Sequence, residues 1–402
     1  MRTLLAVSIG KLLRLVIRIF RRGGGSAFPG LVASKIDPQL LTKAIASCPK
    51  GLVVVSGSAG KSSTTHHLVK LLESHSLKVF TNPSTANIRQ GLFSSVLKEA
   101  NLAGEINHDI AVLEWDEGHG ASLAKELRIS MAVFTNVLSD QLDRFVDPEL
   151  VAEKLASIAD AAKQIVSNSD DKNLAQFASR HQNITGYGLS EKILETDLAP
   201  SYALNFGSHP EIERNVQVEF DNGYKVVMGT QSFQIPVESP ELALNYAAAL
   251  AAASSLVSLD SKKVAAQFES AAGVFARNEQ TQIMGQSVNL RLVQNPTSFQ
   301  LNIDELPKGT SPLMLMAGSD IHDPSWLWTV DFSGIKRVDI VSGSNAYELA
   351  LRLSVAGIEI GEVFPDIPEA TKAFFELDGE APTILFSADA MRRFRRHAQV
   401  AK

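Results

Sequence analysis

Short apolar runs alternate with segments of helical periodicity along the first half of the chain. Residues 52–55 form one apolar run, and residues 64–72 after them have the spacing of an amphipathic helix. Residues 90–100 and 148–163 are further segments of helical character. The other apolar runs of strand length are residues 78–81, Ile110–Glu114, 131–135 and 165–169. This alternation predicts βαβ units, and therefore an α/β fold with a mostly parallel sheet and helices on both faces.

The pattern changes in the second half. Apolar alternation around Asp221-Asn222-Gly223 predicts a hairpin within a small β insertion at about residues 186–237. An alanine-rich helix is predicted at Pro240–Leu256. A third block, from about Ser287, has the pattern of a smaller α/β domain. Its apolar runs and amphipathic helix are Leu313–Met316, 338–342, 383–386 and 345–356. We therefore expect a central domain over residues 49–285 and a C-terminal domain over residues 286–402.

Residues 1–22 form an apolar segment that carries six basic residues and no acidic one. Lys11, Arg14 and Arg18 recur at three- and four-residue steps, which places them on one helical face. Charges within the run argue against a transmembrane helix or a signal peptide. Two interpretations stay open: a basic amphipathic helix that contacts anionic lipid, or a helix packed on the protein body. With the glycine-rich joint that follows, this segment forms an N-terminal region over residues 1–48.

Composition describes an ordinary globular protein, with 45% hydrophobic and 20% charged residues. A net charge of -6 argues against a general nucleic-acid binder. Cys48 is the only cysteine, so neither an internal disulfide nor a cysteine-based zinc site can form. We therefore expect no zinc. A cytoplasmic protein is the default expectation, at the inner face of the plasma membrane if the first helix contacts lipid.

The first apolar run leads into Gly57-Ser58-Ala59-Gly60-Lys61-Ser62-Ser63, which has the order of a phosphate-binding loop. Glycines let backbone N–H groups turn toward an anion, and the following helix N-terminus adds its dipole. The lysine reaches the β- and γ-phosphates, and a serine hydroxyl ligates Mg²⁺. Val55 stands where the common motif has its first glycine. The loop predicts a nucleoside triphosphate site; a plain turn between strand and helix is the competing interpretation.

Polar side chains follow the predicted strands, at the sheet edge where ligands bind in α/β proteins. Glu114 is the candidate Mg²⁺ ligand together with Ser62, because hard carboxylate and hydroxyl oxygens suit this ion. A solvated loop acid is its alternative, and Asp143 with Arg144 also fits a helix N-terminal ion pair. The candidate substrate-binding residues are Thr81, Asn82, Asn87, Asn136, Asp140 and Arg144.

The loop resembles the G-T-N-G-K-T-T loop of the Mur ligase family, which folylpolyglutamate synthases share. Four further segments are similar to motifs of its MurT branch, and the resemblance covers most of the chain. They are Thr81-Asn-Pro-Ser-Thr-Ala-Asn87, Leu113-Glu-Trp-Asp-Glu117, Thr135-Asn-Val-Leu-Ser-Asp-Gln-Leu-Asp-Arg144 and Asp323-Pro-Ser-Trp-Leu-Trp-Thr-Val-Asp-Phe332.

The resemblance implies an ATP- and Mg²⁺-dependent amidation of the D-glutamate α-carboxyl in the lipid II stem peptide. The product would be D-isoglutamine, formed through an acyl phosphate with ammonia from a GatD-like class I glutaminase in a heterodimer. It implies that Lys61 binds the phosphates, that Glu114 binds the metal, and that Asn245 and Arg277 contact ATP. It also assigns Asp323 as the acid lent to the partner's Cys–His pair, with Asp320 as the runner-up.

Several positions depart from the family pattern. The loop has Ser58-Ala59 where the family has Thr-Asn, and Ser62-Ser63 where it has two threonines, so hydroxyls are preserved. Ala248 replaces an adenine-contacting asparagine. Gln294 stands in place of a lysine, and the family's four-cysteine zinc ribbon is missing. Two alternatives therefore stay open beside the amidotransferase subunit. One is a stand-alone Mur-type or folylpolyglutamate-type amino-acid ligase, and the other is a nucleotide-binding scaffold with weakened catalysis.

Overall fold

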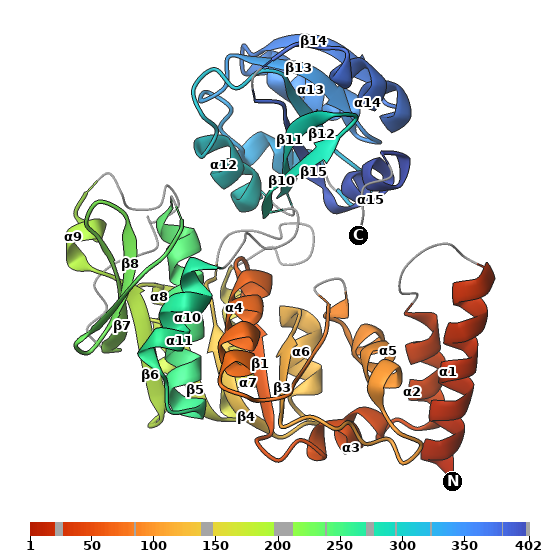
Figure 1. The fold of residues 1–402 in the computed structure, drawn as a ribbon, viewed down its shortest axis with the longest axis vertical. Helices are drawn as coiled ribbons and strands as arrows, with labels where there is room; N and C mark the ends of the chain where they lie inside the picture. Colours follow the sequence, from red (N-terminus) through yellow and green to blue (C-terminus); the bar gives the residue numbers. More distant parts are fainter. Residues whose placement is uncertain are drawn as a thin grey trace. The chain divides into compact units, whose positions relative to one another are not determined.

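The computed structural model divides the chain into two compact units. The central unit comprises residues 1–138 and 147–271, and the C-terminal unit comprises residues 139–146 and 272–402. Figure 1 shows the elements of each unit along the chain. The structure describes residues 1–20, 27–83, 86–137, 148–196, 212–237, 239–270, 277–293, 296–321, 324–379 and 381–398.

The central unit is built on a nine-stranded sheet in the order β2-β3-β1-β4-β5-β6-β7-β8-β9. Neighbouring strands from β2 to β7 are parallel, and β7, β8 and β9 pair antiparallel. The strands are β1 (Leu52–Ser56), β2 (Val79–Thr81), β3 (Ile110–Glu114), β4 (Ile129–Phe134), β5 (Ala162–Asn168), β6 (Ile184–Leu189), β7 (Arg214–Phe220), β8 (Tyr224–Met228) and β9 (Gln231–Gln234). The predicted parallel sheet is confirmed.

Helices cover this sheet because its strands are apolar on both faces. Val53 and Val55 of β1 share one apolar cluster with Leu68 and Leu72 of α4 and with the alanines of α10. On the other side α7 packs on β4 and β5, beside α6 and α8. The helices of the sheet are α4 (Lys61–Ser74), α6 (Glu117–Leu123), α7 (Pro148–Asp160), α8 (Lys172–Ala178), α9 (Glu191–Leu194), α10 (Pro240–Leu256) and α11 (Ser261–Glu269).

The predicted β insertion is a continuation of the same sheet. Its hairpin turns at Asn222 and Gly223, both with positive φ, as the turn signal predicts. Strand β7 pairs with β6 by Tyr187↔Val216, so β7 to β9 extend the edge of the main sheet. Val216, Val218 and Val226 from these strands belong to the apolar cluster under α10. The insertion is therefore held by the core of the central unit.

The N-terminal region is helical and packs on the central unit. Helix α1 (Arg2–Phe20) contacts α2 (Phe28–Ile36) and α5 (Arg89–Glu99), and α3 (Leu40–Ala46) also contacts α5. Among the described residues, no helix is long and apolar enough to cross a membrane. One side of α1 is thus packed on the protein body, as one of the two interpretations predicts.

The C-terminal unit has a six-stranded sheet in the order β10-β11-β15-β12-β13-β14. Its side chains alternate between two cores, as a pleated strand requires. Leu313 and Leu315 face α12 and α13, while Met314 and Met316 face α14 and α15. The strands are β10 (Arg277–Ile283), β11 (Gln286–Val293), β12 (Leu313–Met316), β13 (Arg337–Ser342), β14 (Glu359–Phe364) and β15 (Thr383–Ser387). The helices are α12 (Pro296–Asp304), the 3₁₀ helix η3 (Pro324–Thr329), α13 (Ala346–Val355), α14 (Ile367–Phe375) and α15 (Ala388–His397).

The C-terminal sheet begins earlier in the chain than the predicted domain start. Strand β10 pairs antiparallel with β11 through a turn at Met284 and Gly285. The predicted boundary between residues 285 and 286 therefore lies within this hairpin. The sequence of β10 is polar, Arg-Asn-Glu-Gln-Thr-Gln-Ile, and its lack of apolar alternation hid the strand.

Candidate active site

The predicted phosphate loop connects β1 to α4. Gly57 and Gly60 have φ values of +134° and +80°, a region that other residues avoid. A Cβ at Gly57 would collide with the Thr135 hydroxyl, and one at Gly60 would collide with Oδ1 of Asn245. Both glycines are thus required by backbone conformation and by space. The loop ends at the N-terminus of a 14-residue helix, whose dipole and first-turn amides favour an anion.

Asn136 holds this loop through two hydrogen bonds from loop amides. Its backbone carbonyl accepts a hydrogen bond from the Ser58 amide at 2.9 Å. Its side-chain Oδ1 accepts one from the Ala59 amide at 2.8 Å. Asn136, a candidate substrate-binding residue from sequence, is placed by the fold at the phosphate loop itself. It can bind substrate only through the side-chain nitrogen or after the loop amides are released.

Lys61 is enclosed at the start of α4. Its ammonium group donates to the carbonyls of Gly57 and Ser58 and lies 2.6 Å from Oε1 of Glu117. Burial alone would lower the pKa of Lys61, but the charges of Glu117, Glu114 and Asp116 outweigh it and raise the pKa. Lys61 is therefore a fixed positive charge inside the loop.

Glu117 is the acid that pairs with this lysine. It begins α6, and its side chain is only 2% exposed. Burial raises the pKa of Glu117, while the charge and hydrogen bond of Lys61 oppose the rise. Burial and the charge of Lys61 thus act in opposite directions on this pKa. Because the two charged groups are 2.6 Å apart, we assign both as ionised near neutral pH. Oε2 of Glu117 has no hydrogen-bond partner among the described residues.

Glu117 was not among the site residues predicted from the sequence, although it belongs to the Leu113–Glu117 segment that resembles a family motif. This segment was the available signal, because it spans the end of β3 and carries three acids. What it could not show is which of the three acids meets Lys61.

Glu114, the candidate metal ligand, lies at the last position of β3, in register with Val55 of β1. This register brings the acid to the edge of the sheet where the phosphate loop begins. Asn82 fixes its backbone, since Asn82 accepts from the Glu114 amide at 2.9 Å and donates to its carbonyl at 3.0 Å. The Glu114 carboxylate is buried and accepts a hydrogen bond from Asn87 at 3.4 Å. Two candidate substrate residues thus hold the acid in place.

The donor set fits a Mg²⁺ ion that is bound mainly by phosphate and water. Ser62 at the first turn of α4 and Glu114 supply hydroxyl and carboxylate oxygens, and Oε2 of Glu117 is a further buried oxygen, without a hydrogen-bond partner in the part of the chain that the structure describes. Within the described part of the chain no three His, Cys, Asp or Glu side chains are grouped to hold a metal. Mg²⁺ commonly takes one or two protein ligands together with substrate phosphates, so this set is sufficient.

Some of the other predicted residues lie within the described part of the chain, and the rest lie outside it. Asn245 of α10 accepts a hydrogen bond from the Thr64 hydroxyl at 3.2 Å, directly beneath Gly60. Thr81 ends β2, and its buried hydroxyl has no hydrogen-bond partner among described residues. Asp140, Arg144, Gln294 and Asp323 lie outside the described residues, as does the side chain of Arg277. The alternative acid Asp320 accepts a hydrogen bond from Ser387 at 2.6 Å.

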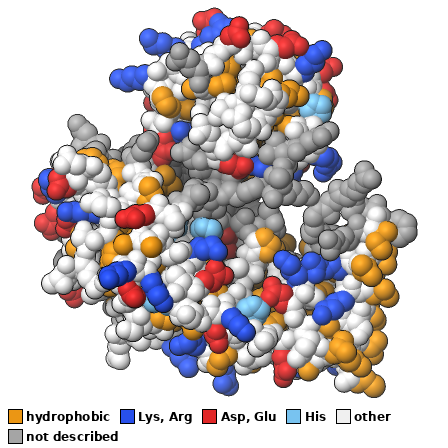
Figure 2. Space-filling view, viewed as in Figure 1, with side chains coloured by type: hydrophobic (Ala, Val, Ile, Leu, Met, Phe, Trp, Pro, Cys, Tyr) orange, Lys and Arg blue, Asp and Glu red, His pale blue; other side chains and the backbone are white. Residues whose placement is uncertain are grey.

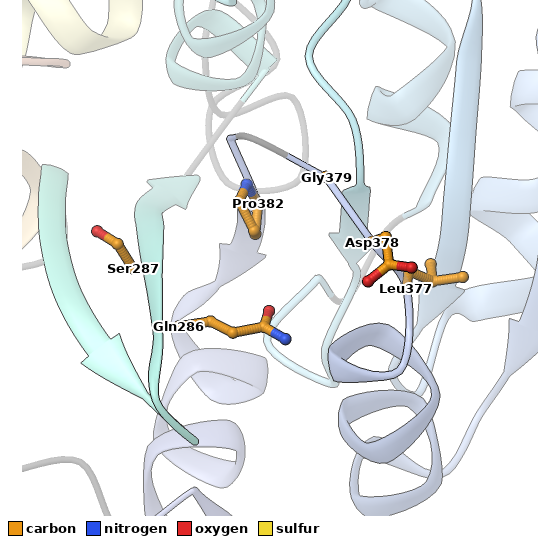
Figure 3. A pocket seen from close by; sticks show the side chains of 6 residues that line it. All are labelled: Gln286, Ser287, Leu377, Asp378, Gly379 and Pro382. Carbon is orange, nitrogen blue, oxygen red and sulfur yellow. The ribbon is translucent and has the colours of Figure 1, made fainter.

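A hollow of about 260 Å³ in the C-terminal unit has a different character (Figure 3). It is lined by Gln286, Ser287, Leu377, Asp378, Gly379 and Pro382. It lies where β11 and β15 begin, whereas ligands of parallel sheets bind at the carboxyl ends of strands. Among its described lining residues, Asp378 is the single ionisable side chain. The phosphate loop is therefore the better candidate for chemistry.

Comparisons with known proteins match both units. A family model described as Mur ligase middle domain matches residues 55–253, and one described as MurT ligase C-terminal matches residues 292–391. Two curated relatives are subunit MurT of the glutamine-hydrolyzing lipid II isoglutaminyl synthase. The one from Staphylococcus aureus strain COL is 25% identical, over 94% of each chain. The one from Streptococcus pneumoniae strain R6 is 27% identical, over 93% of this chain and 92% of the relative.

Solved structures share the fold. The MurF ligase of Thermotoga maritima in complex with ADP has a TM-score of 0.65 and 18% identity, covering 94% of this chain and 88% of that one. Folylpolyglutamate synthase of the same organism has a TM-score of 0.61 and 15% identity, covering 97% of both chains. At these identities the likeness shows the fold alone, and it confirms the predicted Mur-ligase-like architecture.

Proposed function

Because this chain belongs to the Mur ligase family and carries the C-terminal domain of its MurT branch, we propose that it is the synthetase subunit of a glutamine-dependent amidotransferase. Its substrate would be the D-glutamate α-carboxyl in the stem peptide of lipid II or a related lipid-linked precursor. The product would be the D-isoglutamine amide needed in peptidoglycan synthesis. The curated relatives, named as subunits of a glutamine-hydrolyzing lipid II isoglutaminyl synthase, support this choice.

The proposal rests on Lys61, which is 13% exposed within the phosphate loop, pairs with Glu117 and lies beside the buried Glu114. A carboxylate must first be activated, since hydroxide is a poor leaving group. The substrate oxygen attacks the γ-phosphorus of ATP, the bond to the β-phosphate oxygen breaks, and ADP leaves. Ammonia then attacks the acyl carbon of the acyl phosphate, which loses inorganic phosphate and a proton to give the amide.

Each loop element has a part in these steps. Lys61 neutralises charge that develops on the transferred phosphoryl group. Bound Mg²⁺ would add the same electrostatic support to the phosphates, held by Ser62 and Glu114. Asn82 and Asn87 orient Glu114. Asn136 fixes the loop amides, so its contribution precedes any contact with substrate.

We also propose a class I glutaminase subunit of the GatD kind as the ammonia source. The support is the match of residues 292–391 to the MurT C-terminal domain, which a stand-alone amino-acid ligase would lack. The alternative of a scaffold with weakened catalysis rests on the loop substitutions, Ala248 and Gln294, and it stays open although Lys61 is retained and paired with Glu117.

One experiment separates the three functions. The purified chain is incubated with ATP, Mg²⁺ and lipid II, and the products are analysed by mass spectrometry. Three nitrogen sources are compared: ammonium, free amino acids, and glutamine with the co-purified glutaminase. Amide formation with ammonium and with glutamine supports the proposal. Attachment of an amino acid would instead identify a stand-alone ligase, and no ATP-dependent product would identify a scaffold.

A further inference from the structure

Helix α1 carries a row of exposed aliphatic side chains. Their exposed fractions range from 40% for Val16 to 67% for Ile19, which is unusual for so many neighbouring aliphatic residues. We call this row the α1 outer face; it comprises Leu4, Leu5, Leu12, Leu15, Val16 and Ile19. Figure 2 shows hydrophobic side chains gathered along the outer edge of α1.

The opposite side of α1 is already packed, so the outer face is not an unfinished core. Ala6 and Val7 are completely buried, and Gly10 lies directly against Leu97 of α5. Lys11 donates to the Ala100 carbonyl at 2.6 Å, and the Thr3 hydroxyl donates to Asp37 at 2.6 Å. These contacts determine which side of α1 faces the protein body, and the outer face lies on the opposite side.

Positive charge borders this face. Residues 1–36 contain no aspartate or glutamate, although the whole chain has a net charge of -6. Lys11 and Arg14 lie one helical turn apart along one edge of the helix, and Arg18 follows four residues later in the sequence. This edge lies between the buried side and the outer face, since Lys11 is exposed and Arg14 is half-buried. The surface thus combines an apolar row with a cationic margin.

We propose that the α1 outer face docks on an anionic phospholipid bilayer, with α1 parallel to the membrane plane. Aliphatic side chains of such a helix enter the acyl boundary, while long basic side chains reach lipid phosphates. The charge pattern is complementary to anionic headgroups. Protein-binding surfaces are typically centred on Tyr, Trp or Arg, whereas this row has only Leu, Ile and Val. A bilayer therefore fits the composition better than a protein partner or a second copy.

The test measures sedimentation of the full-length chain with vesicles. One set contains phosphatidylglycerol and phosphatidylcholine, and the other contains phosphatidylcholine alone. We expect the chain to bind the anionic vesicles about tenfold more tightly, and binding to weaken as salt is raised. The Leu12→Ser/Leu15→Ser/Ile19→Ser variant should lose binding about a hundredfold, because three apolar side chains no longer enter the lipid. The Arg14→Gln/Arg18→Gln variant should lose the preference for anionic vesicles.

A matched control places serine at exposed aliphatic positions of α13, in Leu351→Ser/Val355→Ser, and should bind vesicles as the parent does. Circular dichroism checks that each variant is folded. Absence of vesicle binding by the parent would overturn the proposal, as would equal binding by the triple variant. Sedimentation velocity without lipid tests the second-copy alternative: a parent dimer that the triple variant converts to monomer would favour that occupant. The vesicles contain no lipid II, so this result and the amidation assay can fail independently.

Discussion

The ammonium group of Lys61 lies 2.6 Å from the carboxylate of Glu117, and the two side chains are only 13% and 2% exposed. The lysine of the phosphate loop is therefore neutralised by a protein acid, and a triphosphate must compete with this acid for it. The pair keeps Lys61 charged and in place at the cost of some affinity for ATP.

Changing Lys61 to Ala should abolish amidation with glutamine and with ammonium alike, because both routes need the acyl phosphate. Amide formation from either nitrogen source is measured with saturating ATP. Lys70→Ala is the control on the same helix, since Lys70 forms its ion pair among the described residues with the surface residue Glu73. Substantial ammonium-driven product from Lys61→Ala would refute the assigned role.

Changing Glu117 to Gln should destabilise the nucleotide-free protein and strengthen its response to ATP. Removing one partner of a buried ion pair costs about 3 kcal/mol of unfolding free energy. Triphosphate would then supply the missing negative charge, so ATP should raise the melting temperature more in Glu117→Gln than in the parent. Glu126→Gln, at a half-exposed surface pair with Arg89, serves as control. An ATP-induced shift no larger than the parent's would contradict competition for Lys61.

Changing Asn136 to Ala should weaken ATP binding about tenfold, because the Ser58–Ala59 segment loses its side-chain acceptor. The KM for ATP is the direct measure. Asn101→Ala removes comparable turn hydrogen bonds to Ala103 and Glu105 far from the loop and should leave this KM unchanged. A changed KM for the peptide substrate with an unchanged KM for ATP would instead support the role of Asn136 in substrate binding that the sequence predicts.

The attachment of α1 should depend on pH through Asp37. Burial alone would raise the pKa of Asp37, but hydrogen bonds from Lys43, Thr3 and the Gln39 amide hold it below the ordinary value of 3.8. A lowered pKa in the folded state gives stability that is present above pH 3.8 and is lost as pH falls through the folded pKa.

Asp37→Asn should accordingly cost about 1 kcal/mol of unfolding free energy at pH 7. The difference from the parent should vanish at pH values below the folded pKa of Asp37. Urea unfolding across this range measures it, with the exposed turn variant Asp221→Asn as control. A difference that persists undiminished in acid would show that the carboxylate charge is not involved.

Asp323 lies outside the described residues, and its role stays a prediction from the resemblance. If it completes the partner's Cys–His pair, Asp323→Asn should nearly abolish glutamine-dependent amidation and leave the ammonium-dependent reaction close to normal. A helix-capping role would lower stability by about 1 kcal/mol and spare glutamine use. Asp320→Asn is the informative comparison, because Asp320 is already engaged by Ser387.

The fold could be predicted where burial on both faces dictates apolar runs. Strands β3 and β12 have the predicted bounds for this reason, as does the alanine-rich α10. Polar strands were not predictable in this way: β10 has no apolar alternation and pairs only through its neighbour β11. Its presence depends on a hairpin with a residue in the left-handed region at Met284 rather than on a hydrophobic pattern.

The position of the candidate site could be predicted from the sequence, but the contacts between its side chains could not. The glycines and Lys61 identify the loop because phosphate binding demands them at fixed spacing. The partner of Lys61 depends on where the first turn of α6 meets the loop, which no local pattern encodes. In the same way, Asn136 was expected at the substrate because it follows a strand, whereas tertiary packing turns its oxygen toward Ala59.

The close approach of Asn245 to Gly60 has a consequence for synthesis of the chain. Asn245 accepts a hydrogen bond from the Thr64 hydroxyl but is synthesised 181 residues after Thr64. It belongs to α10, which packs directly on α4. A nascent chain that ends before α10 therefore has the loop sequence without the residue that lies beneath it. Nucleotide binding by this protein should appear only after the ribosome has released α10, which makes ATP retention a reporter of when the central unit finishes folding.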